Sequence, residues 1–145
     1  MNLSNNFTLE QLTASTVGAK RGIANVPTDE QVANLTELAR ALDKVQALLG
    51  HPLYIDSAFR SPKLNAAVGG SSSSAHLEGY AADIVCVGFG SPIEVIQAIE
   101  NSDIEFDQLI QEGTWTHFSI DPRLREEVLT AHFAGGKVTY TQGIV

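Results

Sequence analysis

The residues best suited to bind a metal ion lie in two short segments of the chain. His76 and Asp83 are seven residues apart, with Gly79 between them, and His117 lies further on between Thr116 and Phe118. Seven residues do not place two side chains on one helix face, so the spacing predicts a loop at His76 that enters a strand at Asp83. Asp83 leads directly into the apolar run 84–87, and a carboxylate entering a buried strand needs compensation, which a cation provides. For this pair alone, a metal-free His–Asp hydrogen bond is the alternative.

Two imidazoles and one carboxylate are a ligand set typical of catalytic zinc. They leave the fourth tetrahedral position open for water, whereas structural zinc sites are closed. Calcium and magnesium require more oxygen ligands than this set supplies. We therefore predict one Zn²⁺ per chain, bound by His76, Asp83 and His117.

An acidic residue lies close to the second histidine if the chain forms a hairpin here. A tight turn at Gly113–Thr114 pairs Glu112 with Trp115, and Ile110 with His117. Glu112 then lies diagonally beside His117, where a carboxylate can act as general base on water. The residues predicted to project to this side are Gln108, Glu112, Trp115, His117 and Ser119.

The position of Arg60 allows two interpretations of its role. It follows a strand and precedes a helix cap, a position typical of a solvated turn residue, but in a peptidase it can grip a substrate carboxylate or stabilise an oxyanion. His51 and His132 are expected to be surface or capping residues. Cys86, in an apolar run, is expected to be a buried strand cysteine rather than a thiol nucleophile.

The helices and strands predicted around these residues indicate an α+β protein. Capping boxes begin at Thr8, Thr28 and Ser91, and a three- and four-residue apolar repeat follows the second of them until Gly50. The polar run 69–74 is interpreted as a surface loop rather than a linker, so 1–145 is expected to be a single domain. Helices are predicted over 8–15, 28–50, 61–68, 91–100 and 122–130, and strands over 53–57, 81–87, 106–111, 115–120 and 137–142.

Composition limits the partners. The net charge is −8, and nine Lys and Arg are scattered along the chain, so a nucleic acid is not expected as partner. No segment reaches the ~20 apolar residues of a membrane span, and the N-terminus lacks the pattern of a signal peptide. We expect synthesis in the cytoplasm, with any export needing outside help.

Three segments together resemble one family of cell-wall peptidases. Ser74-x-His76-x-x-Gly79-x-Ala81-x-Asp83 resembles the zinc motif of zinc D-Ala-D-Ala carboxypeptidases and dipeptidases and of L-alanyl-D-glutamate endolysins. Residues 115–119 and 57–61 resemble the family's second zinc segment and its substrate-arginine segment. Further stretches between about residues 3 and 121, including 64–70 and 106–110, resemble the carboxypeptidase-like branch common in phages and prophages.

The resemblance implies a small hedgehog-like fold around a short antiparallel sheet, with one zinc and peptidoglycan stem peptides as substrate. It implies that Ser74 helps to hold the substrate and that Arg60 binds it or polarises the scissile carbonyl; Gln108 and Trp115 are also assigned to substrate binding. Many members carry their catalytic acid three residues before the second zinc histidine, where this chain has Thr114. We therefore assign the base to Glu112.

The leading hypothesis is a monomeric zinc peptidase that acts on the cell wall, as a phage or prophage lysin or a virion-borne enzyme. The alternatives are a zinc-stabilised, non-hydrolytic cell-wall-binding or virion structural module, and a metal-free fold with buried histidines. Glu112 is the residue that distinguishes them, because a pure binder has no reason to place an acid on the ligand face. The sequence leaves open whether a D-Ala-D-Ala or an L-Ala-D-Glu bond is cut.

Overall fold

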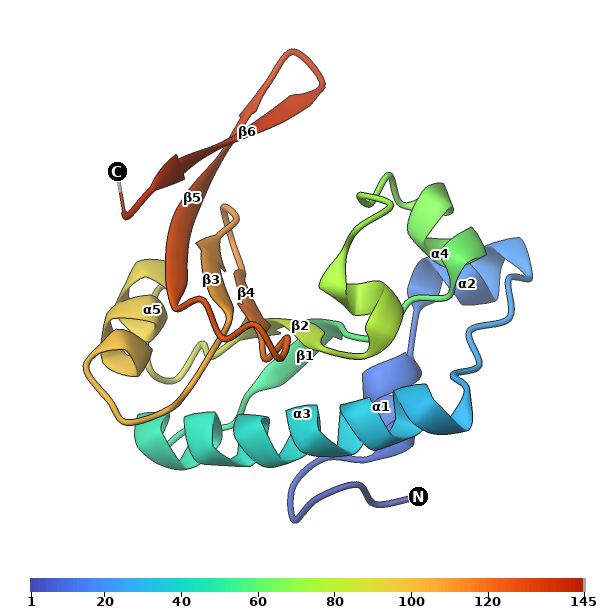
Figure 1. The fold of residues 1–145 in the computed structure, drawn as a ribbon, viewed down its shortest axis with the longest axis horizontal. Coiled ribbons are helices and arrows are strands. Elements are labelled where there is room, and N and C mark those ends of the chain that lie inside the picture. The colour runs from blue at the N-terminus through green and yellow to red at the C-terminus, as the bar shows by residue number, and fades with distance from the viewer. Residues whose placement is uncertain (145) are drawn as a thin grey trace.

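The computed structural model describes residues 1–144. It is an α+β structure, as the sequence predicts, in which helices surround one six-stranded sheet (Figure 1). The helices are α1 (Leu9–Thr13), α2 (Thr16–Arg21), α3 (Asp29–Leu49), α4 (Pro62–Ala67), the 3₁₀ turn η1 (Ala75–Glu78) and α5 (Pro92–Glu100). The strands are β1 (Tyr54–Ser57), β2 (Ala81–Val85), β3 (Gln108–Gln111), β4 (Thr116–Ser119), β5 (Glu127–Ala134) and β6 (Lys137–Gln142).

The helix starts follow the caps seen in the sequence. Thr8, Thr28 and Ser91 each accept a hydrogen bond from the backbone N–H three residues on, and the residue at that position caps in return. The helix α3 ends at Gly50, whose φ of 69° is accessible at little cost only to a residue without a side chain. The short helix α2 was not predicted, because it has no periodic apolar stripe.

The sheet has the strand order β1-β2-β4-β3-β5-β6. Its pairs are antiparallel except for β3 and β5, which are parallel, so the sheet is mixed and not antiparallel throughout. The β3–β4 hairpin has the predicted register: Ile110 pairs with His117, and the Glu112 N–H donates to the Trp115 carbonyl. The acid and the histidine are thereby brought to one end of the sheet.

The predicted helix over 122–130 is wrong. Leu124 and Glu126 have φ values of 42° and 54°, which a right-handed helix does not allow, and the segment continues as β5. The Glu127 N–H donates to the Asp107 carbonyl, which starts the parallel pairing with β3. His132 accordingly lies on an exposed strand, with Nε2 2.8 Å from Thr141 Oγ1, and not near a helix end. The predicted strand at 137–142 is β6.

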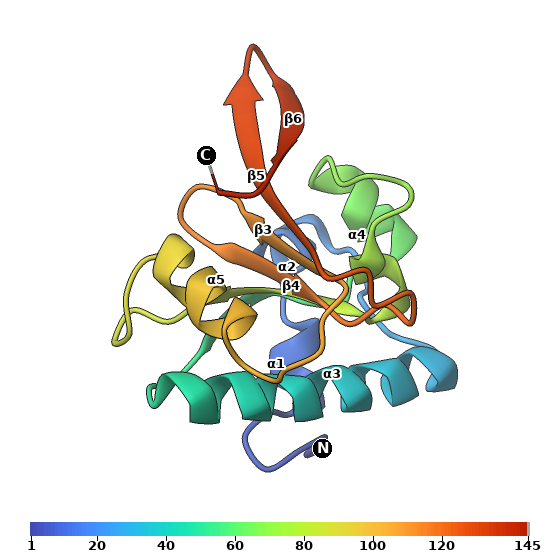
Figure 2. The same ribbon diagram turned by 60° about the vertical axis from the view of Figure 1, so that its left-hand side comes forward.

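The two faces of the sheet differ in character. Figures 1 and 2 show α3 running beneath the sheet, with η1, α4 and the β5–β6 hairpin on the other side. The core lies on the α3 side, where Ala82, Ile84 and Phe118 are at most 1% exposed. Cys86 is part of this core, as expected. Since side chains alternate along a strand, Asp83 and His117 face the opposite side.

The helices of the described residues include none that is long and apolar enough to span a bilayer.

Candidate metal centre

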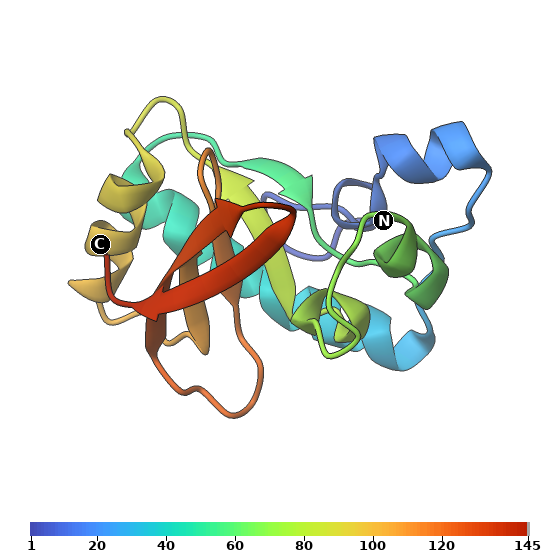
Figure 3. The same cartoon turned by 90° about the horizontal axis from the view of Figure 1, so that it is seen from above.

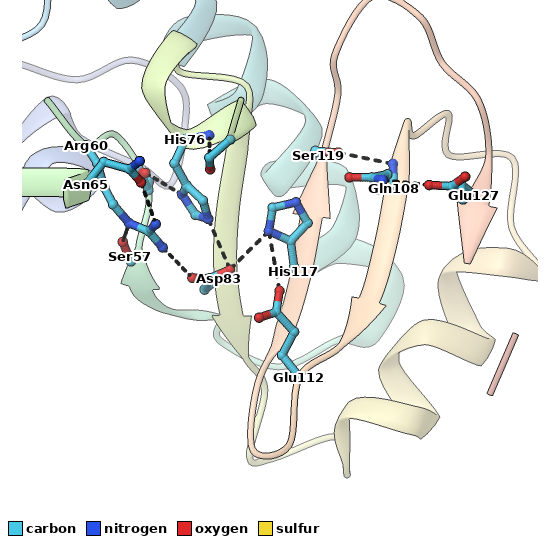
Figure 4. Close-up of polar contacts among 12 residues, drawn as sticks. Ser57, Arg60, Asn65, His76, Asp83, Gln108, Glu112, His117, Ser119 and Glu127 are labelled. Carbon is cyan, nitrogen blue, oxygen red and sulfur yellow. Dashed lines mark hydrogen bonds and ion pairs between the residues drawn. The ribbon is translucent and has the colours of Figure 1, made fainter. Parts of the chain in front are cut away.

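Three side chains that could together hold a metal ion meet on the sheet face away from α3. Asp83 on β2 and His117 on β4 are direct cross-strand partners, and His76 reaches the same point from η1. One ligand atom from each of the three lies within 4.8 Å of the others, and all three residues are buried. The two rings meet edge to face, with centroids 5.2 Å apart. Figure 4 shows Asp83 between the two histidines.

The backbone fixes which nitrogen His76 presents. Its Nδ1 lies 2.6 Å from the Ala58 carbonyl oxygen, and because a carbonyl can only accept, Nδ1 carries the proton. Nε2 is left with a free lone pair, 3.3 Å from Asp83 Oδ1. Burial lowers the pKa of His76 despite the opposing effect of Asp83, so the ring is neutral, the form that binds metals. A histidine that binds a metal usually donates its other ring N–H to a carboxylate, a backbone carbonyl or water, as His76 does here.

Asp83 has an oxygen without a hydrogen bond. Its Oδ1 is buried and lacks such a partner among the described residues, although His76 Nε2 and His117 Nδ1 are each 3.3 Å away. Burial would raise the pKa of Asp83, but the two histidines outweigh it and lower the pKa, so the carboxylate is charged. An anionic oxygen facing two imidazole nitrogens in a buried site fits a bound cation.

Arg60 holds the other oxygen of this carboxylate. Its Nη2 donates to Asp83 Oδ2 at 3.3 Å, while Nε donates to Ser57 Oγ and Nη1 to Asn65 Oδ1, each at 3.1 Å. Arg60 is therefore not a solvated turn residue. Asp83 is oriented by this contact, so that Oδ1 faces the histidines (Figure 4).

Asn65 is a site residue that sequence reasoning did not single out. It is 3% exposed and links two parts of the site: Oδ1 accepts from Arg60, and Nδ2 donates to the Ser71 carbonyl at 2.9 Å. Gly70 lies so close that an added Cβ would be 2.1 Å from Asn65 Oδ1. The available signal was a polar residue on a short helix, within a stretch that resembles the peptidase family.

Glu112 lies beside the triad. Its Oε1 is 3.8 Å from His117 Nδ1, and burial raises its pKa, although the charge of His117 opposes this effect. A carboxylate with a raised pKa is a stronger base than one in water. Thr114, at the position where many relatives carry the acid, is exposed in the turn.

The remaining predicted residues differ in their distance from the triad. Ser74 caps η1, with Oγ accepting from the His76 N–H at 3.2 Å, so it shapes the loop that carries the ligand. Gln108 shares the face of His117, but its amide donates to Glu127 Oε1 at 2.6 Å, and Figure 4 shows both residues away from the triad. Trp115 is half-buried, and its Nε1 is buried without a hydrogen-bond partner among the described residues.

A buried group of two imidazoles and one carboxylate, with a second acid beside it, is characteristic of metal-dependent hydrolases. The model of one protein family, Peptidase M15, matches residues 5–119, and the chain belongs to this family. The predicted membership of the family of zinc D-Ala-D-Ala carboxypeptidases is thereby confirmed. No curated protein matches the chain. The matched range contains the triad, Arg60 and Glu112, but ends before β5 and β6.

Proposed function

We propose that the whole chain is one catalytic domain, a zinc peptidase that hydrolyses an amide bond in peptidoglycan stem peptides. The observation that carries this proposal is the buried Asp83 Oδ1, 3.3 Å from each of two histidine nitrogens and lacking a hydrogen bond within the described chain. Membership of Peptidase M15 supports both the reaction and the cell wall as its location.

His76 Nε2, His117 Nδ1 and an oxygen of Asp83 would hold the zinc. When bound, zinc lowers the pKa of water towards about 7 and polarises a carbonyl group. The donor set supports zinc over calcium or magnesium, because two of its three members are nitrogens.

Glu112 moves the proton. Its carboxylate accepts a proton from the attacking water and delivers it to the leaving amine nitrogen of the peptide. The partial burial of Glu112 supports this role, since the raised pKa makes its carboxylate a better acceptor for the proton of water.

Arg60 orients Asp83 and contacts the substrate. Its three hydrogen bonds use three of the five guanidinium N–H groups, which leaves two for a substrate carbonyl or carboxylate. Ser74, Gln108 and Trp115 are proposed to contact the stem peptide further from the reacting carbonyl.

Fragment release from purified peptidoglycan tests the catalytic role. We expect the zinc-loaded wild type to release peptides, Glu112→Gln to lose about 10²- to 10⁴-fold in rate while keeping its zinc, and His117→Ala to lose both zinc and activity. Thr114→Ala is the matched control from the same turn and should retain full activity.

Zinc that stays bound in a wild type that releases nothing would indicate the non-hydrolytic binding module instead. Absence of zinc after reconstitution would indicate a metal-free fold. Mass spectrometry of released fragments distinguishes a D-Ala-D-Ala carboxypeptidase from an L-Ala-D-Glu endopeptidase.

A further inference from the structure

The β5–β6 hairpin extends the sheet face that carries the triad. The row Asp83–His117–Ile110 continues across β3, because Ile110 pairs with Leu129 of β5. Paired residues share a face, as do residues two apart on a strand. Ala131 therefore lies on the same face, and so does its β6 partner, Tyr140.

Where β3 and β5 pair, this face is apolar, and its side chains are separate from the main core. Ile110, Leu129 and Ala131 form a buried cluster of their own. Further along the hairpin, Tyr140 is 52% exposed and is followed on the same face by exposed Val138. Buried apolar side chains thus begin at Ile110, the partner of a proposed zinc ligand, and exposed side chains continue the same face along the hairpin.

The Tyr140 hydroxyl belongs to a side chain on the same sheet face as His117. Partial burial raises its pKa, and the negative charges of Glu112 and Asp83 raise it further. The phenol is therefore protonated at neutral pH and available as a hydrogen-bond donor. Figures 1 and 3 show the hairpin rising from the sheet and crossing over it on the side away from α3.

We propose that this hairpin face is a substrate-binding wall, in which the exposed Val138 contacts an apolar side chain of the peptide and the Tyr140 hydroxyl donates a hydrogen bond to a peptide oxygen. The buried cluster of Ile110, Leu129 and Ala131 supports this wall from below. This inference rests on the proposed peptidase function. Val138 and Tyr140 lie beyond residue 119, where the family match ends, so this part of the wall is one in which the protein can differ from its relatives in substrate choice.

The test compares Tyr140→Phe, Tyr140→Ala and Thr139→Ala in the zinc-loaded protein. Thr139 is the neighbouring β6 residue on the opposite face, so its variant controls for changes in the hairpin itself. We expect Tyr140→Phe to raise the KM for a stem peptide by about 2- to 10-fold with kcat nearly unchanged, since one neutral hydrogen bond is lost. Tyr140→Ala should raise it further, and Thr139→Ala should match the wild type.

Peptide binding is measured in parallel through the fluorescence of Trp115, the one tryptophan of the chain, in a Glu112→Gln background that does not consume the peptide. Weaker binding by Tyr140→Phe than by its parent supports the wall even if turnover is absent. Equal KM and equal peptide affinity in all three variants would overturn the wall while leaving the peptidase proposal intact. Conversely, an inactive wild type that binds peptide through Tyr140 would overturn the peptidase and keep the wall.

Discussion

Two buried aspartates in this protein have opposite surroundings. Asp107 is fully paired by its own chain: Oδ1 accepts from the Arg125 backbone N–H and Nε, and Oδ2 from Nη2, each at 2.9 Å. Asp83 is paired on one oxygen by Arg60, while the other has no hydrogen bond among the described residues. Burial removes water from both carboxylates, and the cost in free energy must be offset by new interactions. Only Asp107 has protein hydrogen bonds on both of its oxygens to offset that cost. The difference separates a structural ion pair from a site prepared for a cation.

Replacing each aspartate by asparagine should produce opposite results. Asp83→Asn keeps an oxygen for Arg60 but loses the charge, so zinc binding and peptidase activity should disappear. The metal-free fold should lose less stability than in Asp107→Asn, because the new amide can donate to the histidine nitrogens that face it. Asp107→Asn leaves Arg125 without its carboxylate and should destabilise the fold by about 3 kcal/mol, with zinc still bound; this is the low end for a broken buried pair, because Arg125 is partly exposed. Zinc content and urea unfolding measure both. Equal loss of stability in the two variants would remove the distinction.

Removal of the metal should lower stability only in variants that keep the three ligands His76, Asp83 and His117. A ligand that binds the folded state alone stabilises it by about 4 kcal/mol at a free concentration 1,000 times its Kd. We expect a chelator to lower the melting temperature of the zinc-loaded wild type and of Asp107→Asn, but to leave Asp83→Asn unchanged. A chelator-insensitive wild type would indicate that the triad holds no metal that stabilises the fold.

The contact that orients Asp83 can be disturbed from Gly70. An alanine there would place Cβ 2.1 Å from Asn65 Oδ1, so Gly70→Ala should displace Asn65 and, through it, Arg60. Overpacking of this kind costs about 1–3 kcal/mol, and we expect reduced activity and weaker zinc affinity in proportion. Gly69→Ala is the control, because it strains the backbone at a φ of 75° but meets no atom within 4 Å. Zinc titration of the two variants tests this, and equal zinc affinities would contradict the prediction.

The smallest expected effect is the pH dependence contributed by Asp107. Burial would raise the pKa of this carboxyl, but the hydrogen bonds from Arg125 outweigh it and lower the pKa. Stability from a lowered pKa is fully present above the unfolded value, about 3.9, and is lost as the pH falls through the folded value. The free energy of unfolding should therefore fall more steeply below about pH 4 in the parent than in Arg125→Gln, both compared in the Asp83→Asn background to exclude metal linkage. Parallel curves would contradict a lowered pKa for Asp107.

Local sequence was sufficient where short-range chemistry decides structure. The capping residues Thr8, Thr28 and Ser91 identified helix starts, because a side chain that caps acts within three residues. The turn at Gly113–Thr114 gave the hairpin register, and with it the approach of Glu112 to His117. The three residues of the candidate metal site could be singled out because a histidine is followed by an aspartate that leads into an apolar run, a position where a buried carboxylate needs compensation.

Only the tertiary structure decided what depends on distant partners. Residues 122–130 have the composition of a helix, yet Asp107 binds the Arg125 backbone and β3 offers a free edge, so the chain turns and pairs as β5. The contact between Arg60 and Asp83 spans 23 residues, and Asn65 gains its importance from Arg60 and the loop at Ser71. Tyr140 shares the sheet face of His117 through three successive strand pairings, and no local sequence pattern could predict their combined result.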